Sequence, residues 1–183
     1  MLDVVLTKEV ENAAAVAQKM GWQGVITKGF KAVNYDDKSR TLIERGQADC
    51  VYGFETVAWK DDVHHRNSGM NEVIAALMKK KHVAYGICFS MVLAAKGEKR
   101  AQILGRIMQN IDLARKANLD ICLASFAQNP QGIRSPSDLG SFGISLGLKP
   151  EEAKKALYFA EERVNVNQKK KEKAYISPDL YLE

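Results

Sequence analysis

Two arginines, Arg66 and Arg134, occupy polar segments in which a cationic side chain could hold an anionic group. Each lies between a predicted strand and the predicted start of a helix, so both are expected at the carboxyl edge of a parallel sheet. Phosphates bind at such places because the unpaired amides and the dipole of a helix start favour anions. A salt bridge with an acidic neighbour is the structural alternative, and the residues alone leave both interpretations open.

The residues after each arginine have the pattern of a helix start. Ser135 has the side chain of an N-cap, Pro136 stands at the first helical position, and Asp138 stands where it can reach back to the cap. In the same way, Asn67 or Ser68 can cap the helix that follows Arg66. We therefore expect these polar residues to support the two arginine loops.

Motifs for catalytic chemistry are weak. His64 and His65 are adjacent, so on a strand their side chains would point to opposite faces and would not share a metal ion. The segment Gly143–Gly147 spells Gly-x-Ser-x-Gly, but it lies near the end of a predicted helix and not on a strand-to-helix turn. No phosphate-binding glycine loop or dinucleotide motif occurs. We assign no catalytic residue and no metal ligand.

Composition limits the class of protein. The chain has 183 residues, 46% of them hydrophobic, which suits one folded domain. No apolar run reaches the roughly 20 residues of a membrane span, and the N-terminus does not resemble a secretion signal, so a soluble, cytoplasmic protein is expected. Cys50, Cys88 and Cys122 lie in apolar stretches and are expected to be buried free thiols.

The basic residues give a weaker signal than the motifs. A net charge of +5 is compatible with a polyanionic partner, and equally with a role in solubility. Several lysines and arginines on two predicted outer helices are expected to face solvent, and which of them meets a ligand stays open. They are Lys79, Lys80, Lys81, Lys99, Arg100, Arg106, Arg115 and Lys116.

Predicted strands and helices alternate along the chain, which indicates the α/β class with a parallel sheet. Apolar runs mark strands at 4–6, 25–27, 50–54, 83–89 and 121–124, and weaker strands at 31–35 and 62–65. Apolar residues at helical spacing mark helices over 10–20, 68–81 and 98–117, and further helices begin at Pro136 and Pro150. For a chain this short, an open sheet and a short, incomplete barrel are equally compatible with the residues.

Two blocks of sequence share their order and spacing with a known family. The first is Arg66-Asn67-Ser68-Gly69-Met70-Asn71, followed by a predicted helix and the 83–89 strand. The second is Ile133-Arg134-Ser135-Pro136-Ser137-Asp138-Leu139, followed by Gly143-Ile144 and Leu146-Gly147. The chain resembles the archaeal RNase P protein component 3 family in these blocks, and the resemblance covers most of residues 1–160. It departs from the family at Asn67, where many members carry Asp, and in a shortened region before His64.

The resemblance implies a fold: a TIM-like (β/α) barrel, short or incomplete, related to metal-dependent phosphoesterase barrels. Metal-bearing relatives carry His-x-His at the end of the first strand, where this chain has Leu6-Thr7-Lys8, so no metal is expected on the protein. Residues 1–165 are expected to form a single domain and residues 166–183 a basic C-terminal tail. The charged run 168–173 is then either a solvated segment or a basic arm that ribonucleoprotein assembly orders.

The resemblance also implies a function: a protein subunit of RNase P, the ribonucleoprotein whose RNA removes the 5′ leader of precursor tRNA. The expected partners are the RNase P RNA, protein component 2, other RNase P protein subunits and, through the complex, precursor tRNA. The chain alone is expected to be inactive and to bind no cofactor, whereas the RNA uses Mg²⁺. By position, Arg66, Arg134 and, more weakly, Lys28 are expected to bind RNA. A metal-dependent barrel phosphoesterase and a pure protein–protein scaffold are the alternatives.

Overall fold

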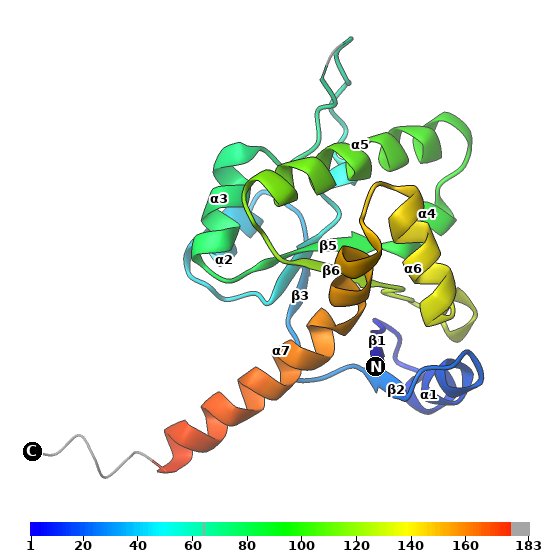
Figure 1. Ribbon diagram of the computed structural model, residues 1–183, viewed down its shortest axis with the longest axis vertical. Helices are drawn as coiled ribbons and strands as arrows, with labels where there is room; N and C mark the ends of the chain where they lie inside the picture. Colours follow the sequence, from blue (N-terminus) through cyan, green and yellow to red (C-terminus); the bar gives the residue numbers. More distant parts are fainter. Residues whose placement is uncertain (64, 177–183) are drawn as a thin grey trace, which may run out of the picture.

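Short parallel strands alternate with helices along the chain (Figure 1). The computed structural model describes the backbone of residues 1–63 and 65–176, and the side chains within these ranges up to residue 172. The strands of this part are β1 (Leu2–Val4), β2 (Gly24–Ile26), β3 (Ala32–Asn34), β4 (Cys50–Tyr52), β5 (Ala84–Cys88) and β6 (Ile121–Ala124). The helices are α1 (Val10–Lys19), α2 (Ser39–Glu44), α3 (Glu72–Lys80), α4 (Phe89–Ala94), α5 (Gly97–Lys116), α6 (Pro136–Ser145) and α7 (Pro150–Ile176), with 3-10 turns η1 (Phe54–Thr56) and η2 (Pro130–Gly132).

The strands pair in parallel in two groups, β1-β2 and β3-β4-β5-β6. A parallel bridge between Val5 and Ala127 joins β1 to the residues after β6. The Asp3 carboxylate also accepts a hydrogen bond of 2.9 Å from the Ser125 amide, so a side chain strengthens this junction. In the described part of the chain β2 and β3 do not pair, and the sheet is open between them. The α/β class and the parallel sheet are confirmed, whereas a closed barrel is not seen.

Side chains alternate between two faces of the strands, and helices cover both faces. The face with Val51, Tyr85 and Leu123 packs against α1, α3, α5, α6 and the first turns of α7. The opposite face carries all three cysteines and packs against Phe159 and Ala160 of α7. The cysteines are buried and free, which confirms the prediction from their apolar surroundings.

Helix α7 crosses the amino-terminal ends of the strands. Its polar side chains bond to residues just before β6, β1, β5, β4 and β3, which are far apart in the sequence. The pairs are Lys155 with Asp120, Glu161 with the Met1 amino group, Arg163 with His82 O and Asp49, and Asn167 with Gly29 O and Asp49. Because α7 covers this end, the opposite, carboxyl ends of the strands carry the loops that are available for a binding site.

Several predicted boundaries differ from the observed ones. The weak strand at 31–35 is present as β3. At the predicted strand 62–65, the described residues 62, 63 and 65 belong to no strand, and the Asp62 amide instead donates to the carbonyl of His65 at 2.8 Å. Helix α3 starts at residue 72 and not at 68, because Asn71 is its N-cap and accepts from the Ile74 amide at 2.9 Å. The predicted strand end, Phe89, opens α4.

Helix α7 also extends further than expected. It runs without a break through residues 166–176, where a tail was predicted. The division between a domain ending at residue 165 and a basic tail stays a prediction, and residues 177–183 lie outside the described part. In Figure 1 the last turns of α7 project away from the sheet and the other helices.

Candidate nucleic-acid interface

The loops after β4 and β6 carry the two predicted arginines. Arg66 lies in the segment between β4 and α3, and Arg134 in the segment between β6 and α6. Both segments leave the carboxyl ends of their strands, on the edge that α7 does not cover. The prediction that both arginines lie in loops at this edge is confirmed, but Arg66 follows β4 through a long loop and not the strand that was predicted just before it.

A buried arginine of α5 holds the loop that leads to Arg66. The Arg106 side chain is fully buried and donates to the carbonyls of Glu55 and Val57, both at 2.8 Å, and to the carbonyl of Trp59. It also pairs with the Asp61 carboxylate at 2.8 Å. Four acceptors within seven residues of loop thus converge on one guanidinium, which fixes the backbone from residue 55 to residue 61.

Arg106 was expected to face solvent, and this expectation is wrong. In α5 the apolar positions Ile103, Ile107 and Ile111 define a buried stripe, and Arg106 and Asn110 fall on it. The helical spacing contained this signal, because a charged residue inside an apolar stripe must find partners in the interior. The spacing does not predict which carbonyl groups Arg106 binds.

The same helix buries a second polar network beneath the loop. Glu55 is buried and its carboxylate accepts from the Tyr85 hydroxyl and, at 2.9 Å, from the Asn110 amide group. Burial raises the pKa of Glu55, although the hydrogen bonds from Tyr85 and Asn110 act in the opposite direction. Asn110 in turn accepts from the Ser68 hydroxyl at 2.7 Å. Ser68 therefore supports the loop by bonding to α5 and not by capping a helix.

Arg66 lies on the surface of α5. Its backbone N–H and carbonyl pair with the side-chain amide of Gln109 at 3.0 and 2.7 Å. Its guanidinium lies over Gly105, where an added Cβ would fall 2.4 Å from Arg66 Cζ. The Arg66 side chain is 50% exposed and its closest ion-pair contact, with Asp61, is long at 3.9 Å. This weak pair leaves the guanidinium able to bind an anion from solution.

Asp61 and Asn67 close the base of this loop. The Asn67 amide donates to Asp61 at 2.9 Å, and its side chain donates to the carbonyl of Lys60 at 2.6 Å and to Asp62 at 3.1 Å. Partial desolvation would raise the pKa of Asp61, but hydrogen bonds from Arg106 and from the Asn67 amide lower it below its ordinary value. Asn67 thus holds the loop that precedes it rather than the helix that follows.

Arg134 is held differently, by its own loop and an aromatic ring. One guanidinium nitrogen donates to the carbonyls of Gln131 and Ile133 at 2.8 and 2.9 Å, and Arg134 Cζ lies 5.8 Å from the centre of the Phe89 ring. Its backbone carbonyl accepts from the Trp22 indole at 2.7 Å. No residue in the described ranges accepts a hydrogen bond from its Nε or from its second terminal nitrogen, so these donors can serve a ligand.

The predicted helix start beside Arg134 is largely confirmed. The Ser135 hydroxyl accepts from the Asp138 amide at 3.1 Å, and Pro136 occupies the first turn of α6. The reciprocal bond from the Asp138 carboxylate to the cap does not form among the described residues. Asp138 is an exposed acid in the first turn, where it suits the helix dipole.

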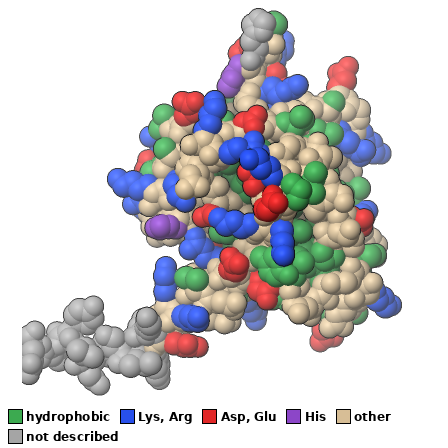
Figure 2. Space-filling model, viewed as in Figure 1, with side chains coloured by type: hydrophobic (Ala, Val, Ile, Leu, Met, Phe, Trp, Pro, Cys, Tyr) green, Lys and Arg blue, Asp and Glu red, His purple; other side chains and the backbone are tan. Residues whose placement is uncertain are grey.

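The three predicted cations do not form one contact cluster in the described part of the chain. Arg66 contacts α5, whereas Arg134 contacts Phe89 and its own loop. Lys28 follows β2 and is exposed. Figure 2 shows basic side chains mixed with acidic and apolar ones over the visible face, so the charge of this face is not of one sign.

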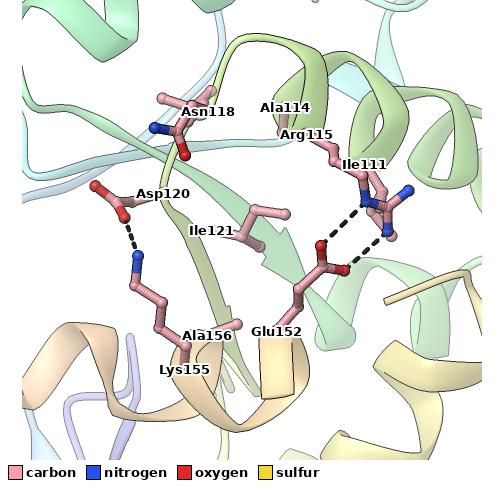
Figure 3. A pocket seen from close by; sticks show the side chains of 10 residues that line it. Ile111, Ala114, Arg115, Asn118, Asp120, Ile121, Glu152, Lys155 and Ala156 are labelled. Carbon is pink, nitrogen blue, oxygen red and sulfur yellow. Dashed lines mark hydrogen bonds and ion pairs between the residues drawn. The ribbon is translucent and has the colours of Figure 1, made fainter. Parts of the chain in front are cut away.

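A cavity of about 140 Å³ between α5 and α7 also carries basic residues, but they are already paired (Figure 3). Arg115 forms two hydrogen bonds with Glu152, at 3.0 and 2.8 Å, and Lys155 pairs with Asp120 at 2.7 Å. The hydrogen bond from Arg115 lowers the pKa of Glu152 to about 2. An anion at this cavity would have to displace a carboxylate from each cation.

Ligand groups for a metal do not come together in the residues that the structure describes: no three His, Cys, Asp or Glu side chains form a cluster. His64 lies outside these residues, and His65 is exposed. In the same ranges, none of the helices has the length and hydropathy to span a membrane.

Comparison with known proteins identifies relatives of this chain. The model of the family RNase P subunit p30 matches residues 60–173, a segment that contains Arg66 and Arg134 but not Lys28. The Ribonuclease P protein component 3 of Methanosarcina acetivorans is 31% identical over 99 residues, which are 54% of this chain and 41% of that protein. That of Thermococcus kodakarensis is 32% identical over 94 residues, 51% of this chain and 43% of that protein.

The chain matches only part of the length of its curated relatives. The aligned part of the chain spans about two fifths of the length of these curated relatives. A chain of a cryo-EM structure of archaeal Ribonuclease P with mature tRNA has a TM-score of 0.71 and 18% identity, covering 98% of this chain and 94% of that chain. At this identity the likeness shows a shared fold. Because the family model matches more than half of its residues, the chain belongs to the RNase P subunit p30 family.

Proposed function

We propose that this chain is a protein subunit of an RNase P ribonucleoprotein and supports the catalytic RNA in removing the 5′ leader of precursor tRNA. One observation carries the proposal: the family match contains Arg66 and Arg134, and both guanidinium groups keep donors that no described residue binds, on loops that buried residues hold in place. Rigid loops that present arginines suit binding to RNA phosphates, because guanidinium matches phosphate oxygens in geometry and charge.

The partners and cofactors follow from this role. We expect the chain to bind the RNase P RNA, protein component 2 and other RNase P protein subunits, and to meet precursor tRNA through the complex. Mg²⁺ is expected to serve the RNA, with no cofactor on the protein. A cytoplasmic location is part of the same proposal.

We also propose that the sheet is a short, incomplete (β/α) barrel. Through the Val5–Ala127 bridge the strands follow the order β2-β1-β6-β5-β4-β3, which is the sequence order taken around a ring. Helices cover the outer face, including the first turns of α7, and Phe159 and Ala160 of α7 pack on the inner face. A barrel with this strand order and a gap between β2 and β3 accounts for the order of the strands and for the helices that pack around them.

Reconstitution tests the proposed function. The chain is combined with component 2 and an RNase P RNA, and cleavage of precursor tRNA is measured at low Mg²⁺. We expect stimulation by the chain within the complex and no cleavage by the chain alone. No stimulation would contradict the proposal, and cleavage by the chain with a divalent metal would favour a barrel phosphoesterase.

The arginines are tested in the same assay. Replacing Arg66 and Arg134 together by Ala should weaken cleavage and lower the salt slope of RNA binding by about 2, because each lost phosphate contact lowers it by about 1. The control is Arg40→Ala with Arg45→Ala, which removes two exposed arginines of the α2 region. Equal effects of the two pairs would show that only net charge matters and would overturn the role of Arg66 and Arg134.

A further inference from the structure

The end of α7 is an extension that packs on nothing in the described residues. Asn167 is its last anchored side chain, donating to the carbonyl of Gly29 at 3.0 Å and to Asp49 at 3.1 Å. Beyond it, residues 168–172 are exposed and make no side-chain bond to any described residue. Figure 1 shows these turns leaving the body of the protein as a single helix.

The extension is strongly basic. Residues 168–173 contain Lys169, Lys170, Lys171 and Lys173 and one acidic residue, Glu172. Successive helical residues are about 100° apart, so the first three lysines are spread around the helix axis rather than on one side. A protein-docking helix needs an apolar stripe, and residues 168–173 have no apolar side chain.

Helix formation here is opposed by charge. Lys169, Lys170 and Lys171 concentrate like charge on three successive residues of this helix end, and these charges repel one another. Such a helix end is marginal by itself, because it lacks the packing that stabilises helices in proteins. A polyanion that neutralises the lysines would remove the repulsion and stabilise the extension.

We propose that Lys169, Lys170 and Lys171 form a second RNA-binding element, which contacts the phosphate backbone of folded RNA on several sides of the helix. The element lies beyond the amino-terminal ends of the strands, whereas Arg66 and Arg134 lie at their carboxyl ends. RNA therefore meets the protein at two separate places, and the bonds of Asn167 and Arg163 to Asp49 direct the extension away from the sheet. This inference rests on the proposed function, since it takes RNA as the partner.

The chain offers a matched control for the test. Lys79, Lys80 and Lys81 form a second run of three lysines, at the end of α3. One variant carries Lys169→Gln, Lys170→Gln and Lys171→Gln, and the control carries Lys79→Gln, Lys80→Gln and Lys81→Gln. Gln has nearly the helix propensity of Lys, so both variants should keep their helices.

The readout is the salt dependence of RNA binding by the assembled complex. We expect the α7 variant to lower the slope of log K against log salt by about 2 to 3, in line with three lost phosphate contacts, and the α3 control to lower it by less than about 1. The loss should add to that of the Arg66 and Arg134 pair, since the two sites share no contacts. Helix content, measured by circular dichroism, should rise when RNA binds the wild type.

The outcomes separate this inference from the proposed function. If the wild type does not stimulate precursor tRNA cleavage, the proposed function fails. If it does, but the α7 variant keeps the wild-type salt slope or changes it no more than the α3 control, the second element is refuted. If the variant loses component 2 while RNA binding keeps its slope, the extension binds an acidic protein surface and the inference is equally overturned.

Discussion

The guanidinium of Arg66 lies directly over Gly105, a residue in the middle of α5, at a distance that leaves no room for a methyl group. An added Cβ would fall 2.4 Å from Arg66 Cζ and 2.6 Å from one of its terminal nitrogens. The Arg66 guanidinium can pack on α5 at this place because Gly105 has no side chain.

Gly105→Ala should move Arg66 without harming the fold. The end of a long side chain swings away at little energetic expense, and alanine stabilises a helix interior relative to glycine by about 0.5–1 kcal/mol. We expect unchanged or slightly higher thermal stability together with weaker RNA binding. In an Arg66→Ala background Gly105→Ala should have no further effect on binding, and an additive loss would show that the two residues act independently.

Arg106→Ala should be among the most damaging single changes in the chain. It leaves three loop carbonyls and Asp61 without their buried partner, which we expect to reduce the free energy of unfolding by about 3–5 kcal/mol. Urea denaturation measures this. The control is Arg40→Ala, which breaks an exposed pair with Glu44 and should change stability by less than about 1 kcal/mol. Similar midpoints for the two variants would contradict the role of Arg106.

Gly69→Ala should disturb the loop next to Arg66 through a steric clash. A Cβ at Gly69 would fall 2.3 Å from Cε1 of Tyr35. The Tyr35 ring packs against the tilted ring of Phe54, with 4.4 Å between centroids, and so resists displacement. We expect a loss of about 1–3 kcal/mol in the free energy of unfolding, as in other overpacked sites. Gly140→Ala, where the nearest atom is 3.6 Å away on Leu157, should be tolerated. Equal stability of the two variants would argue against this packing.

Asp3 should make stability depend on pH. Burial raises the pKa of Asp3 from its ordinary value of 3.8 to about 6, against the opposing hydrogen bonds from Ser125. Between these pH values the folded state holds a proton at Asp3 that the unfolded state has lost, so stability falls as pH rises from about 4 to 6. Two pKa units correspond to about 3 kcal/mol.

The variant Asp3→Asn isolates this effect. The asparagine carbonyl oxygen can still accept from the Ser125 amide, but the side chain does not titrate. The difference in unfolding free energy between wild type and variant should therefore change over pH 4–6 and be constant above about pH 7. A difference that stays constant across the whole range would show that Asp3 does not titrate with a raised pKa.

Local sequence determined the elements and several of their ends. Short apolar runs predicted the strands, and the position of the cysteines within these runs predicted their burial, because strands covered on both faces are apolar on both. Ser135 followed by Pro136 predicted the start of α6, because capping involves only the next three residues. The two motif blocks predicted the family, and the position of Arg134 between a predicted strand and a helix start predicted the edge of the sheet at which it lies. All of these signals depend on residues that are close in the chain.

Tertiary structure decided the partners of the polar residues. Arg106 is buried because carbonyls about 50 residues earlier in the chain converge on it, and Ser68 bonds to Asn110 instead of capping a helix. Arg66 packs on α5, whereas Arg134 bonds to its own loop and lies over Phe89. The position of α7 and the gap between β2 and β3 likewise depend on contacts across the whole chain. Spacing along a sequence identifies a residue that needs a partner, but only folding brings that partner to it.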